Sequence, residues 1–263
     1  MIAVLGPEYS YCHIAAMRSF KGASFVLCRT INDVFSSVAD GKADEGVVPI
    51  ENMLQGSVRE TIFALAKNNV FIHGAYKLPI AHCLASKSES FSKIVSHPQA
   101  LGQCSVFLKA IGKDVVETSS TSEAMKIAGS DVSYAAIGSE LAAKMYWLKI
   151  LRKNIGDSKN NTTLFIRFSK KKHAGSAKNC ITSMLIIPKK DMPGLLVSLL
   201  TPFASAKLNL SKIESVPSGK KLGEYFFIID IDAGLKEVSR ALKPVSRLAS
   251  VRILGSYGVK NLD

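Results

Sequence analysis

The sequence has no long uninterrupted run of apolar residues. One of the longer ones, Tyr225–Ile229, is far shorter than the roughly 20 residues that a helix needs to cross a lipid bilayer. The first residues, Met1–Pro7, lack the basic start and the Ala-x-Ala cleavage site of a secretory signal peptide. We therefore expect a chain that is neither embedded in a membrane nor exported, and that has no membrane partner.

Cysteine is scarce as well. The chain has 5 cysteines, an odd number, and they lie far apart at Cys12, Cys28, Cys83, Cys104 and Cys180. No two of them have the spacing of a zinc site or of a disulfide framework. Isolated thiols are typical of a reducing compartment, so we expect a cytoplasmic protein without a metal centre.

Acidic residues are outnumbered by basic ones. The chain carries 34 Lys and Arg against 21 Asp and Glu, a formal charge of +13. Such an excess can mark a nucleic-acid-binding protein, but the basic residues are spread along both halves of the chain and only Lys170–Lys172 forms a dense run. No basic stretch is interleaved with aromatic residues in the manner of single-strand binders. We expect a solvated basic surface that attracts a small anionic substrate, and no nucleic-acid partner.

The 263 residues, 47% of them apolar and 21% charged, suffice for one large or two moderate globular domains. In the first half, short apolar runs typical of buried strands alternate with segments of helical spacing. The predicted strands are 2–5, 25–28, 46–50, 70–73, 81–85, 94–96, 115–118 and 135–137. The predicted helices are 13–20, 31–39, 60–67, 100–111, 122–128 and 140–146. Repeated β-α-β units predict an α/β fold with largely parallel sheets, in which ligands bind at the carboxyl ends of the strands.

The pattern changes after residue 170. The polar segment 171–179, rich in small residues, is the predicted linker. Beyond it the apolar pattern predicts strands at 181–187, 208–215, 224–231 and 251–254, and helices at 194–206 and 236–248. This β-α-β-β-α-β order within about 80 residues is typical of a ferredoxin-like sandwich, an antiparallel sheet with two helices on one side.

Polar clusters stand at the ends of predicted strands in the first half. They are residues 6–13 (GPEYSYCH), 49–58 (PIENMLQGSV), 96–104 (SHPQALGQC) and 118–121 (TSST), with a fifth, 160–165 (NNTTLF), just before the linker. Ser57, Ser96 and Ser120 each precede a helical stretch, where free backbone N–H groups can bind an anion. Any one cluster can be read as a helix cap or a turn, but five of them favour a common site.

These clusters resemble the signature blocks of the prephenate dehydratase family, and they occur in that family's order. Residues 6–11 resemble Gly-Pro-x-Gly-Thr-Phe, and 51–58 resemble Glu-Asn-Ser-x-x-Gly-Ser-Val. Residues 96–104 are nearly identical to Ser-His-Pro-Gln-Ala-Leu-x-Gln-Cys, and 161–165 resemble Asn-x-Thr-Arg-Phe. The C-terminal part is similar to the family's ACT regulatory domain, with Gly-Ala-Leu-Val answered by 194–197 and Glu-Ser-Arg-Pro by 214–217.

The resemblance implies a domain plan and an activity. Residues 1–170 would form a catalytic domain of two parallel-rich α/β lobes around a cleft, like periplasmic binding proteins; 180–263 would form a ferredoxin-like ACT domain. The implied reaction converts prephenate to phenylpyruvate, with loss of carbon dioxide and water, in phenylalanine biosynthesis. Because the reaction forms an aromatic ring, its thermodynamic driving force comes from the substrate itself. Neither a metal nor an organic cofactor is therefore expected.

The matching blocks also imply site residues. Thr163 is the expected donor to the leaving hydroxyl, a positioned hydroxyl rather than a true acid, and His97 and Gln103 join it as catalytic residues. The implied substrate-binding residues are Ser10, Glu51, Asn52, Ser57, Ser96, Ser119, Ser120, Thr121 and Phe165. Asn52 and Gln103 offer neutral donors, whereas Glu51, awkward beside a dianion, is expected to hold Asn52 or a turn. Cys104 is expected to be a core residue.

The C-terminal blocks imply an effector site for L-phenylalanine. Its residues would be Gly194, Leu195, Leu196, Val197, Glu214 and Ser215. ACT domains of this family pair, and the alternating apolar residues of 181–187 and 225–231 suit a covered sheet face, so we expect a homodimer or homotetramer. Val216 stands where the family has Arg, which predicts weak or altered phenylalanine binding because a charge-assisted hydrogen bond is lost.

Two further departures leave alternatives open. Leu164 stands where the family has Arg beside the catalytic Thr, and Tyr9 replaces a Gly in the first loop. A leucine cannot replace the bidentate recognition of a carboxylate by arginine. The alternatives are a small-anion sensor of the same fold with weakened catalysis, and an arogenate dehydratase, which carries out the same elimination on the amino-acid analogue.

Overall fold

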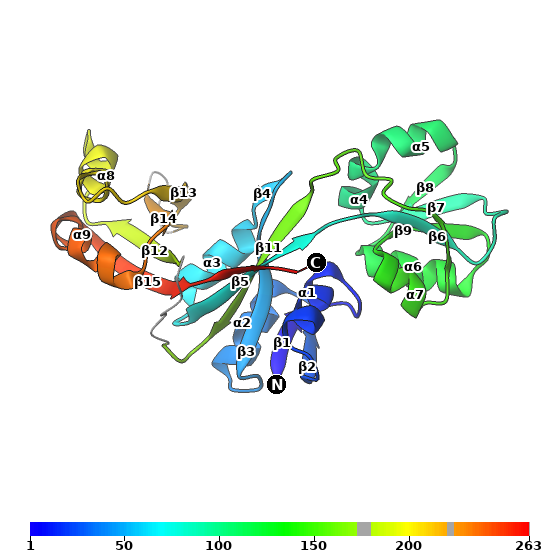
Figure 1. Cartoon of the computed structure of the whole chain (residues 1–263), viewed down its shortest axis with the longest axis horizontal. Coiled ribbons are helices and arrows are strands. Elements are labelled where there is room, and N and C mark those ends of the chain that lie inside the picture. Colours follow the sequence, from blue (N-terminus) through cyan, green and yellow to red (C-terminus); the bar gives the residue numbers. More distant parts are fainter. Residues whose placement is uncertain (173–179, 220–223, 263) are drawn as a thin grey trace.

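Three β-sheets, each with its own helices, lie in a row along the long axis of the molecule (Figure 1). The computed structural model describes residues 1–172, 180–219 and 224–262. We call the three parts lobe 1, in the middle, lobe 2, at one end, and the C-terminal domain, at the other. The predicted linker at 171–179 lies, apart from its first two residues, outside the described part of the chain.

Lobe 1 contains most of the first 80 residues and two later strands. Its elements are β1 (Ile2–Leu5), α1 (Tyr11–Ser19), β2 (Phe25–Cys28), α2 (Ile31–Ala39), β3 (Glu45–Asn52), β4 (Gly56–Ser57), α3 (Arg59–Lys67), β5 (Phe71–Pro79), β11 (Thr162–Ser169) and β16 (Val259–Asn261). The sheet order is β16-β5-β11-β3-β1-β2, with β4 paired to β3. β1 is parallel to both β2 and β3, and its Ala3 and Val4 are fully buried, as expected of a strand covered on both faces.

The predicted α/β fold is confirmed, but its sheets are mixed rather than largely parallel. The chain leaves lobe 1 after β5 and returns from lobe 2 as β11, which lies antiparallel between β3 and β5. The result is a mixed sheet. This returning strand matters for function because its register places Thr163 directly opposite Asn52 of β3.

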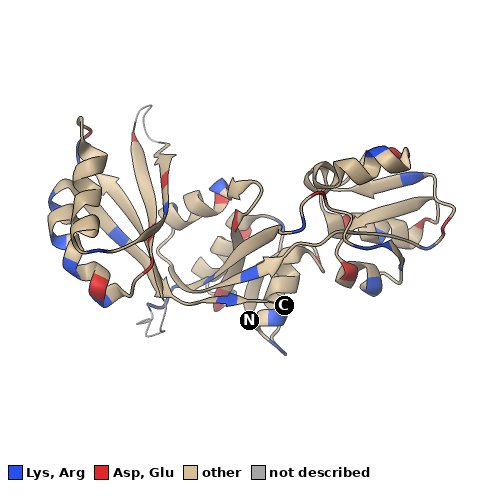
Figure 2. Cartoon of the chain, turned by 45° about the horizontal axis from the view of Figure 1, so that its top comes forward, with Lys and Arg blue, Asp and Glu red and all other residues tan. Residues whose placement is uncertain are grey.

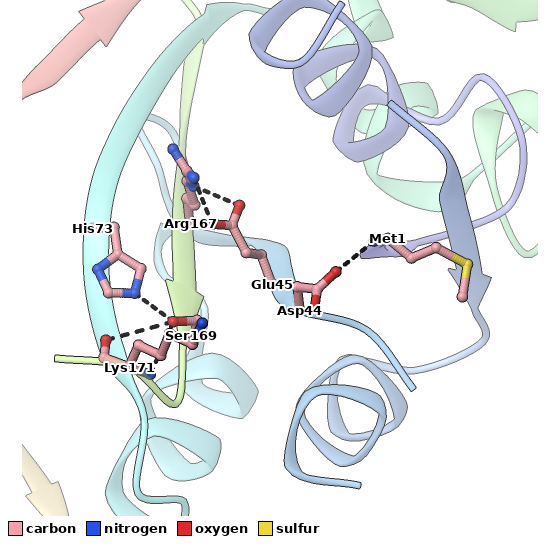
Figure 3. A network of polar contacts seen from close by, with 7 residues as sticks. All are labelled: Met1, Asp44, Glu45, His73, Arg167, Ser169 and Lys171. Atoms are coloured by element: carbon pink, nitrogen blue, oxygen red, sulfur yellow. Dashed lines mark hydrogen bonds and ion pairs between the residues drawn. The ribbon is translucent and has the colours of Figure 1, made fainter. Parts of the chain in front are cut away.

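Polar contacts hold the register of β11 at the far end of the sheet (Figure 3). Arg167 of β11 donates to both carboxylate oxygens of Glu45 at the start of β3, with Nε–Oε2 2.7 Å and Nη2–Oε1 2.5 Å. On the other side of β11, His73 Nε2 lies 2.7 Å from Ser169 Oγ. A two-point arginine–carboxylate pair has little geometric freedom. It therefore restrains sliding of β11 past β3.

Lobe 2 is an insertion between β5 and β11. Its elements are β6 (Cys83–Ser86), β7 (Lys93–Ser96), α4 (Pro98–Gln103), α5 (Ser105–Ile111), β8 (Asp114–Glu117), α6 (Thr121–Ser130), β9 (Tyr134–Gly138), α7 (Glu140–Met145) and β10 (Lys149–Arg152). The sheet order is β10-β6-β9-β7-β8. This sheet is mixed too, because β6 runs antiparallel to β9 and β10 while β7 runs parallel to β8 and β9.

The single helix predicted at 100–111 is two helices. The chain bends at Cys104, with φ −119° and ψ 26°, between α4 and α5. The carboxylate of Asp157 caps the second helix: it accepts the backbone N–H of Ser105 (3.0 Å) and of Val106 (3.1 Å). The cap comes from more than 50 residues away, so local spacing alone did not reveal the break.

The C-terminal domain has the predicted β-α-β-β-α-β order. Its elements are β12 (Ile181–Pro188), α8 (Leu195–Ser205), β13 (Leu210–Pro217), β14 (Tyr225–Ile231), α9 (Leu235–Leu248) and β15 (Ala249–Tyr257). The antiparallel sheet has the order β13-β14-β12-β15. One face buries Met184, Ile229 and Ile231 against α8 and α9. The ferredoxin-like arrangement is therefore confirmed.

The other face of this sheet packs on lobe 1. Leu185, Val216, Ile228 and Leu254 belong to one buried cluster with Ile62, Leu65, Ile72 and Phe168 of lobe 1. The strands cross so closely that a Cβ on Gly255 of β15 would overlap the carbonyl oxygen of Ile72. Both faces of the sheet are thus covered within one chain, and the alternating apolar residues of 181–187 and 225–231 are no argument for a second copy.

The C-terminal domain predicted at 180–263 ends earlier than expected. After β15 the chain returns to lobe 1, where β16 pairs parallel with β5, Val259 opposite Ala75. The last described residues thus complete the lobe 1 sheet rather than the C-terminal domain.

Lys and Arg residues occur in all three parts rather than on one element (Figure 2). Within the ranges that the structure describes, no helix is long and apolar enough to cross a membrane.

Candidate active site

A cavity of about 500 Å³ lies between lobe 1 and lobe 2. Both lobes line it, at the ends of β1, β3 and β7 and along the start of β11. Ten of the predicted site residues line it: Ser10, Asn52, Ser57, His97, Gln103, Ser119, Ser120, Thr121, Thr163 and Phe165. The structure thus brings together residues that are up to 155 positions apart, between Ser10 and Phe165.

Two predicted substrate-binding residues do not line this cavity. Ser96 is fully buried, and its hydroxyl donates to the carbonyl oxygen of Ile137 (2.7 Å), which ties β7 to β9. Glu51 precedes Asn52 on β3, and alternation along a strand turns its side chain the other way. There it pairs with Lys212 of the C-terminal domain. Substrate contact by Ser96 or Glu51 is therefore not supported.

Helices begin at the cavity wall. The starts of α1, α3 and α6 lie there, at Tyr11, Val58 and Thr121. Ser10 and Ser120 cap α1 and α6 through their side chains, whereas α3 has no side-chain cap. Free N–H groups and the helix dipole make such starts favourable places for an anion.

Formal charge is absent from the wall itself. Among the described residues that line the cavity there is no Lys, Arg, Asp or Glu. The titratable lining groups are Tyr11, Cys12, His82 and His97. Burial raises the pKa of Cys12 to about 12 and that of Tyr11 well above its usual value. A bound anion would therefore meet neutral donors and helix starts.

The carboxamide of Asn52 has one orientation, because two backbone groups determine it. The N–H groups of Leu54 and Gln55 donate to Asn52 Oδ1, at 3.0 and 3.2 Å. The opposite atom, Nδ2, must then donate, and it does so to Asn161 Oδ1 and Thr163 Oγ1, both at 2.9 Å. Since the Thr163 oxygen accepts from Asn52, its own proton remains available for a group in the cavity.

The direction of hydrogen-bond donation set at Asn52 continues through Asn161 to Gln103. Asn161 accepts through Oδ1, so its Nδ2 donates to Gln103 Oε1 (3.0 Å). His82 Nε2 lies 2.9 Å from the same oxygen, and it must carry a proton to bond there. Gln103 Nε2 is buried and has no hydrogen-bond partner among the described residues. Gln103 lines the cavity, so this N–H₂ group is a donor without an acceptor beside the empty space.

His82 and Tyr11 are site residues that sequence reasoning did not single out. Tyr11 Oη donates to the carbonyl oxygen of Ala81 (2.8 Å) and lies 3.1 Å from His82 Nδ1. Burial lowers the pKa of His82. Tyr11 stood inside the first polar cluster, which was a usable signal; His82 lay in a predicted strand, and nothing local marked it.

His97 begins α4. Its Nδ1 accepts the backbone N–H of Gln99 (3.2 Å), so the neutral ring carries its proton on Nε2. Cys104, expected in the core, is fully buried, and burial raises the pKa of its thiol to about 12. That thiol is no nucleophile near neutral pH.

The predicted effector residues lie on two elements of the C-terminal domain. Gly194, with φ 77°, precedes α8, and Leu195 is buried while Leu196 and Val197 are 40% and 69% exposed. Glu214 and Ser215 lie on the edge strand β13. Val216 is 2% exposed within the core shared with lobe 1. An apolar residue suits that position, and it is out of reach of a soluble ligand.

Sequence and structure comparisons agree on a family. The prephenate dehydratase family model matches residues 2–173. The chain is 41% identical over 238 residues to a prephenate dehydratase of Methanocaldococcus jannaschii, covering 88% of this chain and 87% of that protein. It is 39% identical over 267 residues to a bifunctional chorismate mutase/prephenate dehydratase of Aquifex aeolicus, covering 97% of this chain and 73% of that protein.

A solved structure supports the same assignment over the whole chain. The prephenate dehydratase of Arthrobacter aurescens in complex with L-Phe has a TM-score of 0.88 and 32% identity, covering 98% of this chain and 89% of that one. The similarity therefore includes the C-terminal domain as well as the two lobes. On the family match, the relatives and the shared fold, this chain belongs to the prephenate dehydratase family.

Proposed function

We propose that the cavity binds prephenate and converts it to phenylpyruvate, carbon dioxide and water. The observation that carries this proposal is the hydroxyl of Thr163, which lines the cavity and accepts from Asn52 Nδ2. Its proton is thereby directed away from Asn52. A donor of that kind is what a departing hydroxyl needs, because a hydroxide leaves more easily when it leaves as water.

The substrate carries two carboxylates, and the cavity offers donors rather than cations for them. The starts of α1, α3 and α6 supply backbone N–H groups, and Gln103 supplies a carboxamide N–H₂ whose orientation Asn161 and His82 fix. Fixed neutral donors need no reorganisation when an anion arrives. The net positive charge of the chain adds long-range attraction.

The elimination is balanced without an added reagent. The bond between the ring and its carboxylate breaks, the electron pair moves into the ring, and the bond to the ring hydroxyl breaks at the opposite carbon. Thr163 donates a hydrogen bond to the departing oxygen, and a proton from solvent completes the water molecule. The cavity has to orient the dianion and assist that departure, and positioning of this kind is worth several kcal/mol.

The sensor alternative rested on Leu164. Thr163 and Phe165 line the cavity, whereas Leu164 packs against the core shared with the C-terminal domain. A leucine at this position therefore removes no group from the cavity wall, and we favour an active enzyme. Prephenate and arogenate differ only in the side chain, which carries a keto group in prephenate and an amino group in arogenate. Turnover of both substrates distinguishes the two activities.

We further propose L-phenylalanine as an effector of the C-terminal domain. The relative from Arthrobacter aurescens was solved in complex with L-Phe. Here α8 begins without a side-chain cap. The N–H of Leu195 donates to the carbonyl oxygen of Met192 (3.1 Å), so the next N–H groups, of Leu196 and Val197, are the ones offered to a carboxylate. Because Val216 belongs to the core rather than to an accessible surface, the weak binding expected from it does not follow.

Purified protein should form phenylpyruvate from prephenate after treatment with a chelator, and faster than it consumes arogenate. Phenylalanine should lower the rate. The measurement is the absorbance of phenylpyruvate over time, with and without the amino acid. A folded protein that binds prephenate in calorimetry yet leaves it intact would support the sensor alternative.

Thr163→Ala should lower kcat by at least about 10²-fold, because the only proposed donor to the leaving oxygen is lost. Thr163→Ser keeps the hydroxyl and should retain much more activity. The matched control is Thr162→Ala on the same strand, whose side chain does not line the cavity. Equal kcat in all three variants would rule out the role given to Thr163.

Asn52→Asp should be nearly as harmful as Thr163→Ala. The carboxylate still accepts from Leu54 and Gln55, but it cannot donate, so Thr163 would turn its proton toward residue 52 instead of the substrate. The double variant Asn52→Asp/Thr163→Ala combines the two changes. Steady-state kinetics should show that its kcat is close to that of Thr163→Ala alone. A control for the added charge is Asn69→Asp, at an exposed position just after α3. Full activity of Asn52→Asp would mean that the polarity of this network is unimportant.

We also propose that the chain forms at least a dimer through the C-terminal domain. Exposed apolar side chains occur there on α8 and on the edge strand β13: Leu196, Val197 and Ile213. Light scattering at micromolar concentration should give at least twice the 28.4 kDa of one chain. Charged substitution of Val197 and Ile213 should shift the mass toward one chain; a wild-type monomer contradicts the proposal.

A further inference from the structure

One ion pair joins the C-terminal domain to the strand that carries Asn52. Lys212 Nζ of β13 lies 2.5 Å from Glu51 Oε2 at the end of β3, 161 residues earlier in the chain. The Lys212 side chain is only 14% exposed and that of Glu51 is 41% exposed. A lysine is rarely buried to this degree unless it is paired, so the contact is more than a mobile surface pair.

Lys212 is also close to a second carboxylate, in its own domain. It stands opposite Asp230 of β14 in the sheet register. Asp230 Oδ1 accepts from Ser183 Oγ (2.5 Å), and Ser183 Oγ lies 2.6 Å from Tyr257 Oη. Burial raises the pKa of Asp230, and the hydrogen bond from Ser183 and the charge of Lys212 oppose that rise. The ammonium group of Lys212 thus pairs with Glu51 of lobe 1, and its charge also acts on Asp230 of its own domain.

Glu51 lies at the centre of the segment that forms the site. It precedes Asn52 directly, and its neighbours in the sheet are Leu164 of β11 and Ser57 of β4. Leu164 in turn follows Thr163. Since side chains alternate along a strand, Asn52 and Thr163 face the cavity while Glu51 faces the C-terminal domain. An interaction that fixes Glu51 therefore also restrains the backbone of β3 at Asn52 and, through the sheet, that of β11 at Thr163.

We propose that Lys212 is a positioning residue for the reaction, acting through Glu51 on Asn52 and Thr163. This proposal rests on the proposed prephenate dehydratase function. Without the lysine charge Glu51 has no counter-ion, and the end of β3 is no longer held against β13. The Asn52 carboxamide moves with it, and the donor geometry at Thr163 deteriorates.

The experiment compares Lys212→Met, Glu51→Gln and the double variant with wild type. Methionine keeps most of the apolar stem of the lysine and removes its charge. Each single variant should lower kcat by roughly tenfold or more, since small displacements of a catalytic group are costly, with a smaller change in KM. The double variant should be no worse than either single one, because both remove the same contact.

Two controls separate positioning from general damage. Lys212→Arg keeps the charge and should retain most of the activity. Lys149→Met removes an ion pair of the same length, Lys149–Glu89 at 2.5 Å, from an exposed place in lobe 2, and it should leave kcat unchanged. Should Lys212→Met fail to fold, the double variant Lys212→Met/Glu51→Gln carries the test, because it leaves neither member of the ion pair charged.

A readout independent of turnover is amide hydrogen exchange of residues 53–57. Exchange of the Leu54 and Gln55 N–H groups, which donate to Asn52, should accelerate in Lys212→Met and not in Lys149→Met. Unchanged exchange, or a kcat within about twofold of wild type in folded Lys212→Met and Glu51→Gln, overturns the proposal. If wild type itself does not turn over prephenate, the proposed function fails, while the exchange result still decides whether Lys212 holds the strand.

Discussion

Two backbone N–H groups that donate to one side-chain oxygen determine the chemistry of this cavity. Leu54 and Gln55 bond to Asn52 Oδ1, and backbone N–H groups cannot act as acceptors. The direction of every later hydrogen bond follows: Asn52 donates to Asn161 and Thr163, and Asn161 donates to Gln103. The proton of Thr163 and the N–H₂ of Gln103 are left as the donors that we propose for the substrate. A carboxamide that was free to rotate could not give the threonine a definite role.

A cavity without formal charge can still bind a dianion. Helix starts and fixed carboxamides surround the space, and each carries only partial charge. A lysine or arginine would hold the substrate more tightly through its carboxylates, but one of those carboxylates has to leave as neutral carbon dioxide. In the proposed function, partial charges distributed over several donors would hold the dianion and leave the departing carboxylate without a full counter-charge.

The C-terminal domain is part of the same folded unit as lobe 1. Its sheet shares a buried cluster with Ile62 and Ile72, Gly255 allows β15 to pass close to β5, and β16 extends the lobe 1 sheet. Lys212 adds a polar connection to the end of β3. A change in this domain, such as binding of an effector at β13, therefore has a short physical route to Asn52.

The family, ten of the residues that line the cavity, the described helices apart from the break between α4 and α5, and the described strands apart from β4, β10, β11 and β16 could be read from the sequence. These depend on local patterns: apolar spacing, turns, and polar blocks at strand ends. The direction in which each side chain faces depends on contacts made after folding. Glu51 and Ser96 stand in the same blocks as cavity residues but face the C-terminal domain and β9, because strand alternation and sheet partners set their direction. His82, the split at Cys104 and the place of β16 likewise depend on contacts with distant residues. Distance along the chain hides such contacts, since nothing in a local pattern says which segment will lie beside it after folding.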